Sequence, residues 1–220
     1  MNKVLTLGAT AGPILFTAAW AILGVVSPGY TLWDIHIAPY SAVSQPISGL
    51  GLGPTGPFMN SAFVLSGLLL LGGVVGIVWS IPELGPRARW GSAALLALSP
   101  LGCIADGIFT LESFLPHFIG YLVAIGSTVV SFSVFGLVIR RLPRWRGIGN
   151  GLLVASPLTL VLMVVAQLTF DPIAAGANLG IAGLTERIAV TEVFLWFAAL
   201  GWAARRSFEV AQRAVLRVAA

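Results

Sequence analysis

The sequence predicts an all-α polytopic integral membrane protein. We expect a single bundle of six transmembrane helices over residues 1–220, with both termini in the cytoplasm. Of the 220 residues, 57% are hydrophobic and only 9% are charged, and the mean hydropathy is +0.96. A soluble domain of this size needs more charge to cover its surface. The apolar residues also gather in long runs, and the basic residues gather in the short links between those runs.

Six apolar segments account for most of the chain. They span residues 4–26, 61–81, 91–111, 118–139, 148–170 and 188–204. Each is near the length of about 20 residues that an α-helix needs to cross the hydrocarbon core of a bilayer. The first segment follows Lys3, as in a signal peptide, but its apolar run is too long and no small-residue cleavage site follows. We therefore keep it as a helix.

The basic residues predict the orientation of the bundle. Links 82–90 and 140–147 and the tail after residue 204 are rich in arginine, and Lys3 precedes the first segment. With both termini inside, eleven of the 12 Lys and Arg residues face the cytoplasm and only Arg187 lies outside. Cytoplasmic loops of membrane proteins carry an excess of positive charge, so the reverse orientation is disfavoured.

The pI near 10.0 does not indicate a nucleic-acid-binding protein. The sequence has no basic stripe interleaved with aromatic residues, and we expect no nucleic-acid partner. The single cysteine, Cys103, lies in an apolar run, so no intramolecular disulfide is possible. We expect Cys103 to be a small packing residue.

The predicted outer side carries most of the irregular chain. The outer link of residues 27–60 is rich in glycine, proline and serine, and residues 171–187 form a second outer link. A long link without periodicity is usually functional or forms a lid. We therefore expect any site to lie on this side.

Asp106 is the most informative polar residue, because it lies well inside the third apolar segment. An aspartate at the bilayer centre costs about 2.5–3.5 kcal/mol, so such residues are kept for a partner or a task. On a continuing helix, Thr110 and Ser113 would share the face of Asp106. His117 would extend this stripe, but we expect Pro116 to end the helix first. Asp106 either acts in the function or bonds a neighbouring hydroxyl or a carbonyl freed by a proline.

Glu112 and His117 lie between the third and fourth segments, at the predicted outer end. Either residue is a solvated turn residue or a member of a site. Histidine titrates in the physiological range, so His117 could act as an acid, a base or a ligand.

The sixth segment begins with LTERIAVTEVFLWF and carries the remaining polar candidates. Arg187 departs from the positive-inside pattern, so we expect it to have an anionic partner. This partner is either a protein carboxylate, which would tie two helix ends together, or a ligand. Glu186 precedes Arg187, while Glu192 lies deeper in the apolar run, with Trp196 one turn further along.

Asp34 and His36 lie two residues apart in the long outer link. On a strand they would share a face, and together with His117 they could approach a metal. Two histidines and scattered carboxylates do not form a firm zinc motif, so we expect no metal site. The sequence indicates no cofactor.

Four motifs together resemble a bacterial and archaeal membrane family known as domain of unknown function 998. These are YSAVSQPISGLG, MNSAFVLSGLLLLGG, DGIFTLESFLPHFIGYL and GLTERIAVTEVFLWF, and they span most of the chain. The resemblance implies a six-helix bundle with a histidine and a Glu-Arg pair at the outer face, in a prokaryotic plasma membrane. It implies no activity.

The leading hypothesis is a pocket, open to the outer leaflet, that binds a membrane lipid or a small anionic amphiphile. Arg187 would hold the headgroup, Trp196 would line the apolar part, and Asp106, Glu192 and His117 would supply polar contacts or acid–base chemistry. Further candidate contacts are Glu186, Glu112, Asp34 and His36. A small-solute or proton-coupled transporter and a structural or assembly protein remain as alternatives, and enzymatic activity and oligomeric state stay open.

Overall fold

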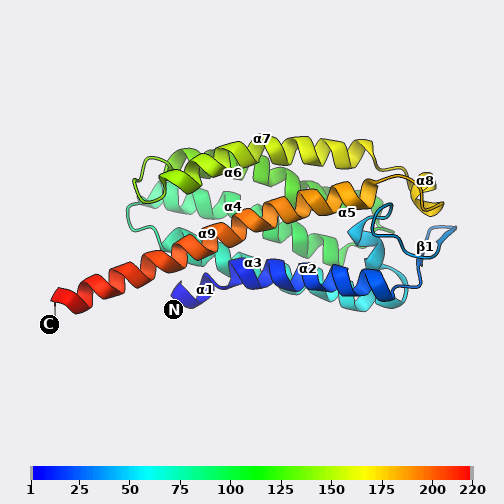
Figure 1. The fold of residues 1–220 in the computed structure, drawn as a ribbon, viewed down its shortest axis with the longest axis horizontal. Helices are drawn as coiled ribbons and strands as arrows, with labels where there is room; N and C mark the ends of the chain where they lie inside the picture. Colours follow the sequence, from blue (N-terminus) through cyan, green and yellow to red (C-terminus); the bar gives the residue numbers. More distant parts are fainter. Residues whose placement is uncertain (1, 219–220) are drawn as a thin grey trace.

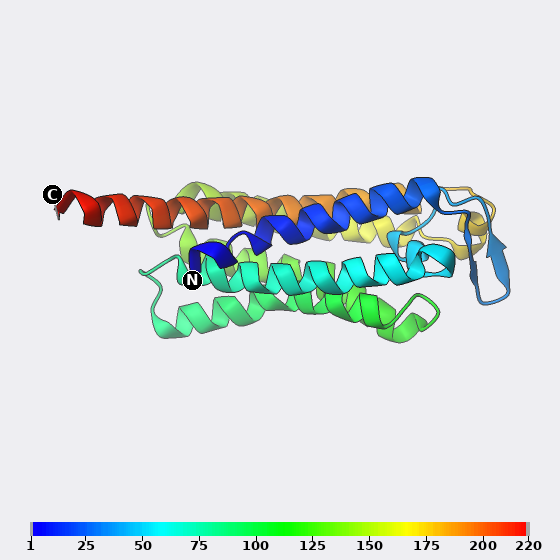
Figure 2. The same cartoon turned by 90° about the horizontal axis from the view of Figure 1, so that it is seen from below.

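The computed structural model describes residues 2–218, and the side chains of residues 3–171 and 174–209. Long helices lie along one common axis, with the connecting segments at the two ends (Figures 1 and 2). The helices that form these rods are α2 (Gly8–Val26), α3 (Gly56–Trp79), α4 (Pro86–Ile108), α5 (Phe114–Tyr121) with α6 (Ser127–Ile139), α7 (Arg146–Leu168) and α9 (Ala182–Val218). A π-helical turn, Leu122–Gly126, joins α5 to α6. The short helices α1 (Asn2–Leu5) and α8 (Pro172–Gly176) precede α2 and α9.

Within residues 2–218, six helical spans are long and apolar enough to cross a membrane, which confirms the predicted six-helix architecture. Several helices begin earlier than the hydropathy predicts: α3 begins at Gly56 instead of residue 61, and α9 at Ala182 instead of residue 188. Hydropathy detects the apolar run, but the first turn of a helix tolerates proline and polar residues. The first turn of α4 illustrates this, since it starts on Pro86.

Small residues let neighbouring helices approach closely. A Cβ atom on Gly73 of α3 would lie 2.3 Å from the backbone nitrogen of Ala9 in α2. A Cβ atom on Gly102 of α4 would lie 2.2 Å from that of Ala124 in the π-helical turn. Close backbone approach at small residues is how membrane helices gain packing energy without a hydrophobic driving force between them. The bundle closes because α9 packs against both α7 and α2.

The long link between α2 and α3 is folded. Its first part is an antiparallel hairpin of β1 (Tyr30–Leu32) and β2 (Ile35–Ile37), and its last part is two 3₁₀ turns, Ile47–Gly51 and Gly53–Thr55. Residues 44–52 are buried, and the first 3₁₀ turn packs against α2, α3 and α9. We call residues 41–52 the capping segment, because they close one end of the bundle.

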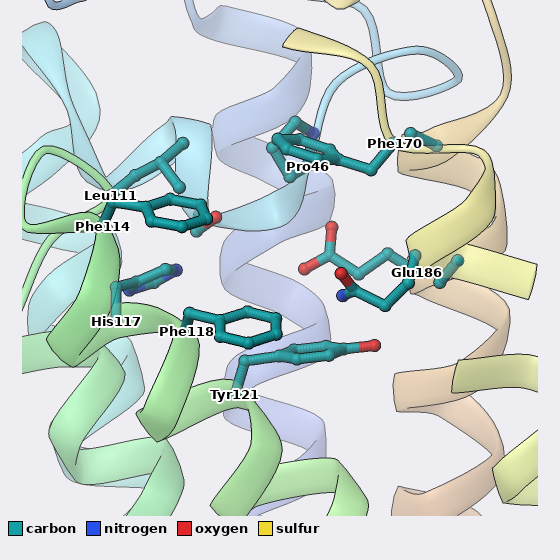
Figure 3. A pocket seen from close by; sticks show the side chains of 12 residues that line it. Pro46, Leu111, Phe114, His117, Phe118, Tyr121, Phe170 and Glu186 are labelled. Atoms are coloured by element: carbon teal, nitrogen blue, oxygen red, sulfur yellow. The ribbon is translucent and has the colours of Figure 1, made fainter. Parts of the chain in front are cut away.

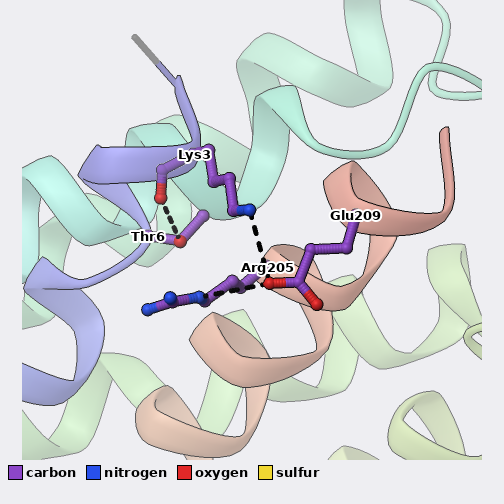
Figure 4. A network of polar contacts seen from close by, with 4 residues as sticks. All are labelled: Lys3, Thr6, Arg205 and Glu209. Atoms are coloured by element: carbon purple, nitrogen blue, oxygen red, sulfur yellow. Dashed lines mark hydrogen bonds and ion pairs between the residues drawn. The ribbon is translucent and has the colours of Figure 1, made fainter. Parts of the chain in front are cut away.

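The hairpin and α8 lie at one end of the bundle, which we call the hairpin end, and both termini lie toward the other end (Figure 1). At that opposite end, the Glu209 Oε1 forms ion pairs with the Lys3 Nζ at 3.3 Å and with the Arg205 Nε at 3.6 Å (Figure 4). Exposed pairs of this kind contribute little to stability, because water and salt screen the charges. They join the start of the first span to the end of the last.

The charge pattern predicts that the hairpin end faces outward. A cysteine introduced at Asp34, in the exposed hairpin turn, should react with a membrane-impermeant maleimide in intact cells. A cysteine introduced at Glu83, in the exposed link between α3 and α4, should react only after permeabilisation. The native Cys103 is buried and should give little background. The reverse labelling pattern would invert the orientation.

Candidate functional site

Arg187 of α9 is buried, with 6% of its surface exposed, and it holds the capping segment. Its Nη1 donates to the carbonyl oxygens of Ala42 at 2.9 Å and Gln45 at 3.0 Å, and to that of Gly183 at 2.8 Å. Its Nη2 donates to the Tyr40 hydroxyl. A guanidinium presents several donors in a fixed fork, which suits a loop that offers several carbonyl oxygens.

Tyr40 and Glu186 complete the attachment of the capping segment. The Tyr40 hydroxyl donates to the carbonyl of Pro46 at 3.0 Å, and the Glu186 Oε2 accepts from the Ile47 backbone N–H at 2.8 Å. Burial raises the pKa of Tyr40 to about 12, against the lowering effect of the adjacent Arg187 guanidinium. Tyr40 therefore stays a neutral phenol at physiological pH and can donate its proton to Pro46.

The expected anionic partner of Arg187 is not what the structure shows. Among the described residues Arg187 forms no ion pair with a carboxylate, and its partners are carbonyl oxygens and a phenol. It does tie distant parts of the chain together, but it ties α9 to the capping segment. The sequence could not show this, because backbone carbonyls carry no side-chain signature.

A cavity of about 90 Å³ lies directly beneath the capping segment. It is bounded by α5 on one side and by α7 and α9 on the other (Figure 3). Aromatic rings form much of its wall, and these belong to Phe114, Phe118, Tyr121 and Phe170. The wall also contains the polar side chains of Ser48, His117, Gln167 and Glu186 and the apolar residues Pro46, Leu111, Ala166 and Ala182.

A second, deeper cavity of about 40 Å³ shares several of these residues. Ser48, His117, Tyr121 and Glu186 line both cavities, and Asp106 lines only the deeper one. The structure therefore brings three predicted site residues together at the hairpin end. They come from α4, α5 and α9, so no single helix carries the site.

Asp106 and His117 face one another across the turn between α4 and α5. The His117 Nδ1 lies 3.6 Å from the Asp106 Oδ1 and 2.8 Å from the carbonyl oxygen of Phe109. A carbonyl oxygen only accepts hydrogen bonds, so Nδ1 carries a proton and donates a hydrogen bond to the Phe109 carbonyl. In the neutral imidazole Nε2 is then an acceptor, so this histidine could take up a proton from a bound group.

The predicted stripe of Asp106, Thr110 and Ser113 on one helix face is wrong. Helix α4 ends at Ile108, and the chain reverses before α5 begins at Phe114. Pro116 does not end a helix before His117, because it lies in the first turn of α5, where its missing N–H costs nothing. The reversal, and not helical periodicity, places His117 beside Asp106.

Gly120 makes room for the Asp106 carboxylate. A Cβ atom at Gly120 would lie 2.1 Å from the Asp106 Oδ1, far inside van der Waals contact. This oxygen has no hydrogen-bond partner among the described residues, and neither has the hydroxyl of Tyr121. Buried polar atoms are rarely left without a partner, so these two atoms point to water or a ligand in the cavities.

Glu192 and Trp196 do not line the cavities that contain Asp106, Glu186 and His117. The residues that were predicted to form one pocket therefore lie at two separate sites. Glu192 and Trp196 line a groove of about 600 Å³ along one face of α9, which Arg187 also borders. The Glu192 Oε2 accepts from the Thr159 hydroxyl at 2.7 Å, and its Oε1 has no partner among the described residues. The indole of Trp196 rests on α7, where a Cβ atom on Gly151 would lie 2.4 Å from the ring. Glu192 is thus separated from the Asp106–His117 pair.

The remaining candidates are exposed and lie outside both cavities. Asp34 is in the hairpin turn, and the His36 Nδ1 lies 3.3 Å from the Thr31 hydroxyl on the paired strand. Glu112 is exposed in the α4–α5 turn, where its carbonyl accepts from the indole of Trp33 at 3.4 Å. Within residues 2–218 no group of three His, Cys, Asp or Glu side chains could hold a metal ion.

Sequence reasoning missed several residues of the cavity wall. Ser48, Tyr121 and the phenylalanines carry no chemical signature on their own, because serines and aromatic residues are common in membrane segments. Ser48 belongs to the YSAVSQPISGLG motif, so this motif was the one feature of the sequence that pointed to the capping segment as part of the site.

Comparison with known proteins agrees with this architecture. The family model described as Protein of unknown function (DUF998) matches residues 10–203, which include every residue of both cavities. The chain belongs to this family. No curated protein and no solved structure matches the chain significantly. The DUF998 match therefore confirms the predicted family and leaves the activity to be argued from the site.

Replacing Arg187 with lysine should loosen the capping segment of this DUF998 protein. A lysine cannot donate to Ala42, Gln45 and Tyr40 together, so we expect a loss of about 2–4 kcal/mol in the free energy of unfolding. Denaturant titration in detergent and proteolysis within residues 41–52 would measure it. Arg140→Lys, at an exposed position, should change stability by at most about 0.5 kcal/mol. Equal stability of both variants would contradict the anchoring role.

Gly120→Ala should destabilise the protein by about 1–3 kcal/mol, because the new methyl group overlaps the Asp106 carboxylate. Adding Asp106→Ala should recover most of this loss, since the overlap disappears. Gly91→Ala is the matched control, because a Cβ there meets nothing within 4 Å and alanine favours the helix. Thermal unfolding of the wild type and the three variants would measure these changes, and the absence of recovery in the double variant would place the strain elsewhere.

Proposed function

We propose that the cavity beneath the capping segment binds the polar head of a membrane amphiphile, whose apolar chain leaves sideways into the bilayer. The observation that carries this proposal is the composition of the cavity wall. Aromatic rings meet polar side chains at the level where the helical spans end, and the Tyr121 hydroxyl in this wall and the Asp106 Oδ1 in the deeper cavity are buried without a hydrogen-bond partner among the described residues. Pockets of this kind, mostly apolar with a few convergent polar groups, are the usual form of a small-molecule site.

The packing of α5 supports sideways access. Helix α5 packs mainly on α4 and on the π-helical turn, whereas α7 packs mainly on α6 and α9. Phe114 at the cavity wall is 48% exposed, and Gln167 on the opposite side is exposed as well. The π-helical turn directly follows Tyr121, and such turns are frequent at functional sites. These features favour an opening between α5 and α7.

The volume limits what the cavity can hold. A space of about 90 Å³ is smaller than the usual range of about 300–1,000 Å³ for ligand pockets. Only a compact head can be enclosed, and the rest of the ligand must lie outside. This suits an amphiphile whose chain stays in the membrane.

The alternatives have less support. A transporter needs a polar route through the bundle, but the buried ionisable side chains among the described residues, Asp106, His117 and Arg187, all lie toward the hairpin end. A purely structural role accounts for the hydrogen bonds of Arg187 to the capping segment, but not for the buried Asp106 Oδ1, which has no hydrogen-bond partner among the described residues. We place the protein in a prokaryotic plasma membrane, as the family resemblance implies.

Native mass spectrometry of protein extracted from its own membrane would test the proposal. The wild type should carry a defined extra mass, and Ala166→Leu should lose it, because Ala166 lines the cavity and a larger side chain fills it. Ala11→Leu makes the same change on an exposed face of α2 and should retain the mass. A bound mass that is equal in all three proteins, or absent from all three, would contradict the proposal.

A further inference from the structure

We infer that the head bound in this cavity is a cation, a protonated amine with few or no substituents. The inference rests on the proposed function and names the chemical class of its ligand. Two carboxyl groups border cavities that share lining residues, the Asp106 Oδ1 has no hydrogen-bond partner among the described residues, and no Lys or Arg side chain of the described residues forms an ion pair with either carboxyl group. Charge, hydrogen-bonding capacity and size each favour an ammonium group.

The carboxyl groups are built into the protein. The Glu186 Oε2 is fixed by the Ile47 N–H at 2.8 Å, and the carboxylate points into the cavity (Figure 3). Asp106 is 6% exposed, and its Oδ1 lacks a hydrogen-bond partner although the Gly120 position leaves space for it. Burying two carboxylates is costly, and a bound cation would stabilise both of them.

Among the described residues no Lys or Arg side chain forms an ion pair with Asp106 or Glu186, and the basic group nearest to Asp106 is His117, whose Nδ1 lies 3.6 Å from the Oδ1. Arg187 follows Glu186 in sequence, but its guanidinium is turned to the capping segment, where both terminal nitrogens have partners. His117 is the basic side chain that lines both cavities, and its Nδ1 is directed to the carbonyl of Phe109. An anionic head would meet two carboxyl groups without a compensating cation. The anionic amphiphile expected from sequence therefore fits this cavity poorly.

The aromatic wall favours a cation as well. The rings of Phe114 and Phe118 are stacked, with centroids 5.9 Å apart and an angle of 6° between their planes. Tyr121 follows one turn later on the same helix face, and its ring also borders the cavity (Figure 3). The faces of aromatic rings attract ammonium groups, most strongly where water is excluded.

Hydrogen bonding and size narrow the class to simple amines. The partnerless Asp106 oxygen is an acceptor and the Tyr121 hydroxyl can accept, so they suit a head that donates N–H bonds. The volume of about 90 Å³ excludes a sugar or a phosphoglycerol head but admits an ammonium with the first carbons of its chain.

Matched probes with a twelve-carbon chain would test the inference in neutral maltoside micelles at pH 7. The probes are dodecylamine, dodecanol and dodecanoate, and native mass spectrometry together with the ligand-induced shift in melting temperature would measure their binding. The amine should bind the wild type at least about tenfold more tightly than the alcohol, and the carboxylate should bind most weakly.

Three variants separate the carboxyl groups of the cavity from other acidic residues. Glu186→Gln keeps an oxygen that can accept from Ile47, so the capping segment should stay in place while the preference for the amine falls to about threefold or less. Asp106→Asn should lower the preference in the same direction. Glu112→Gln removes an exposed carboxylate at the same end of the bundle and should leave the preference unchanged.

The outcomes distinguish the ligand class from the pocket itself. If Ala166→Leu abolishes binding but the alcohol or the carboxylate binds as tightly as the amine, the pocket stands and the cation is wrong. The cation is also wrong if Glu112→Gln lowers the preference as much as Glu186→Gln. If no probe binds, or if Ala166→Leu leaves all binding unchanged, the proposed pocket itself fails.

Discussion

The buried guanidinium of Arg187 is the constraint on which the hairpin end depends. A buried charge is tolerated only when it is well hydrogen-bonded, and the terminal nitrogens of Arg187 donate to the carbonyl oxygens of Ala42 and Gln45 and to the Tyr40 hydroxyl. This requirement fixes the capping segment over the bundle. Successive residues on a helix point in directions about 100° apart, so Glu186 faces a different side of α9 and enters the cavity. The adjacent residues Glu186 and Arg187 thus have different tasks: Arg187 holds the capping segment, and Glu186 supplies a carboxylate to the cavity beneath it.

Beneath the capping segment, the ends of helices place the side chains that line the cavities. Helix α4 stops at Ile108, the chain reverses, and α5 returns with His117 opposite Asp106. Gly120 permits the close approach because any side chain there would displace the carboxylate. The π-helical turn after Tyr121 continues the span into α6. The polar groups are held by backbone geometry at the ends of helices, and this leaves their free oxygens facing the cavity.

The structure also separates two kinds of buried polar residue. Both terminal nitrogens of Arg187 and the Tyr40 hydroxyl form hydrogen bonds that hold the capping segment, so their contribution is to stability. The Asp106 Oδ1 is buried without a hydrogen-bond partner among the described residues, whereas Glu186 accepts from the Ile47 N–H and His117 donates to the Phe109 carbonyl. Buried polar atoms of this second kind lower stability unless something occupies the site, and proteins keep them where a ligand or a reaction uses them. The same separation sets Glu192 apart, because its groove lies on the outer face of α9 and shares no wall with Asp106.

Hydropathy alone was enough to predict the six spans, because a helix that crosses a bilayer must be long and apolar, and the six apolar segments are the parts of the sequence that meet this requirement. The sequence also marked Asp106, His117 and Glu186 as candidates, because ionisable residues are rare in such helices. Only the tertiary structure decided which of them meet. Helical periodicity predicted that Thr110 and Ser113 would share the helix face of Asp106. Helix α4 instead ends early and a turn follows. A turn can bring together residues whose separation in the sequence follows no helical period. The partners of Arg187 were hidden for the same reason, since they are carbonyl oxygens of a folded loop, which every residue possesses and only the fold can position.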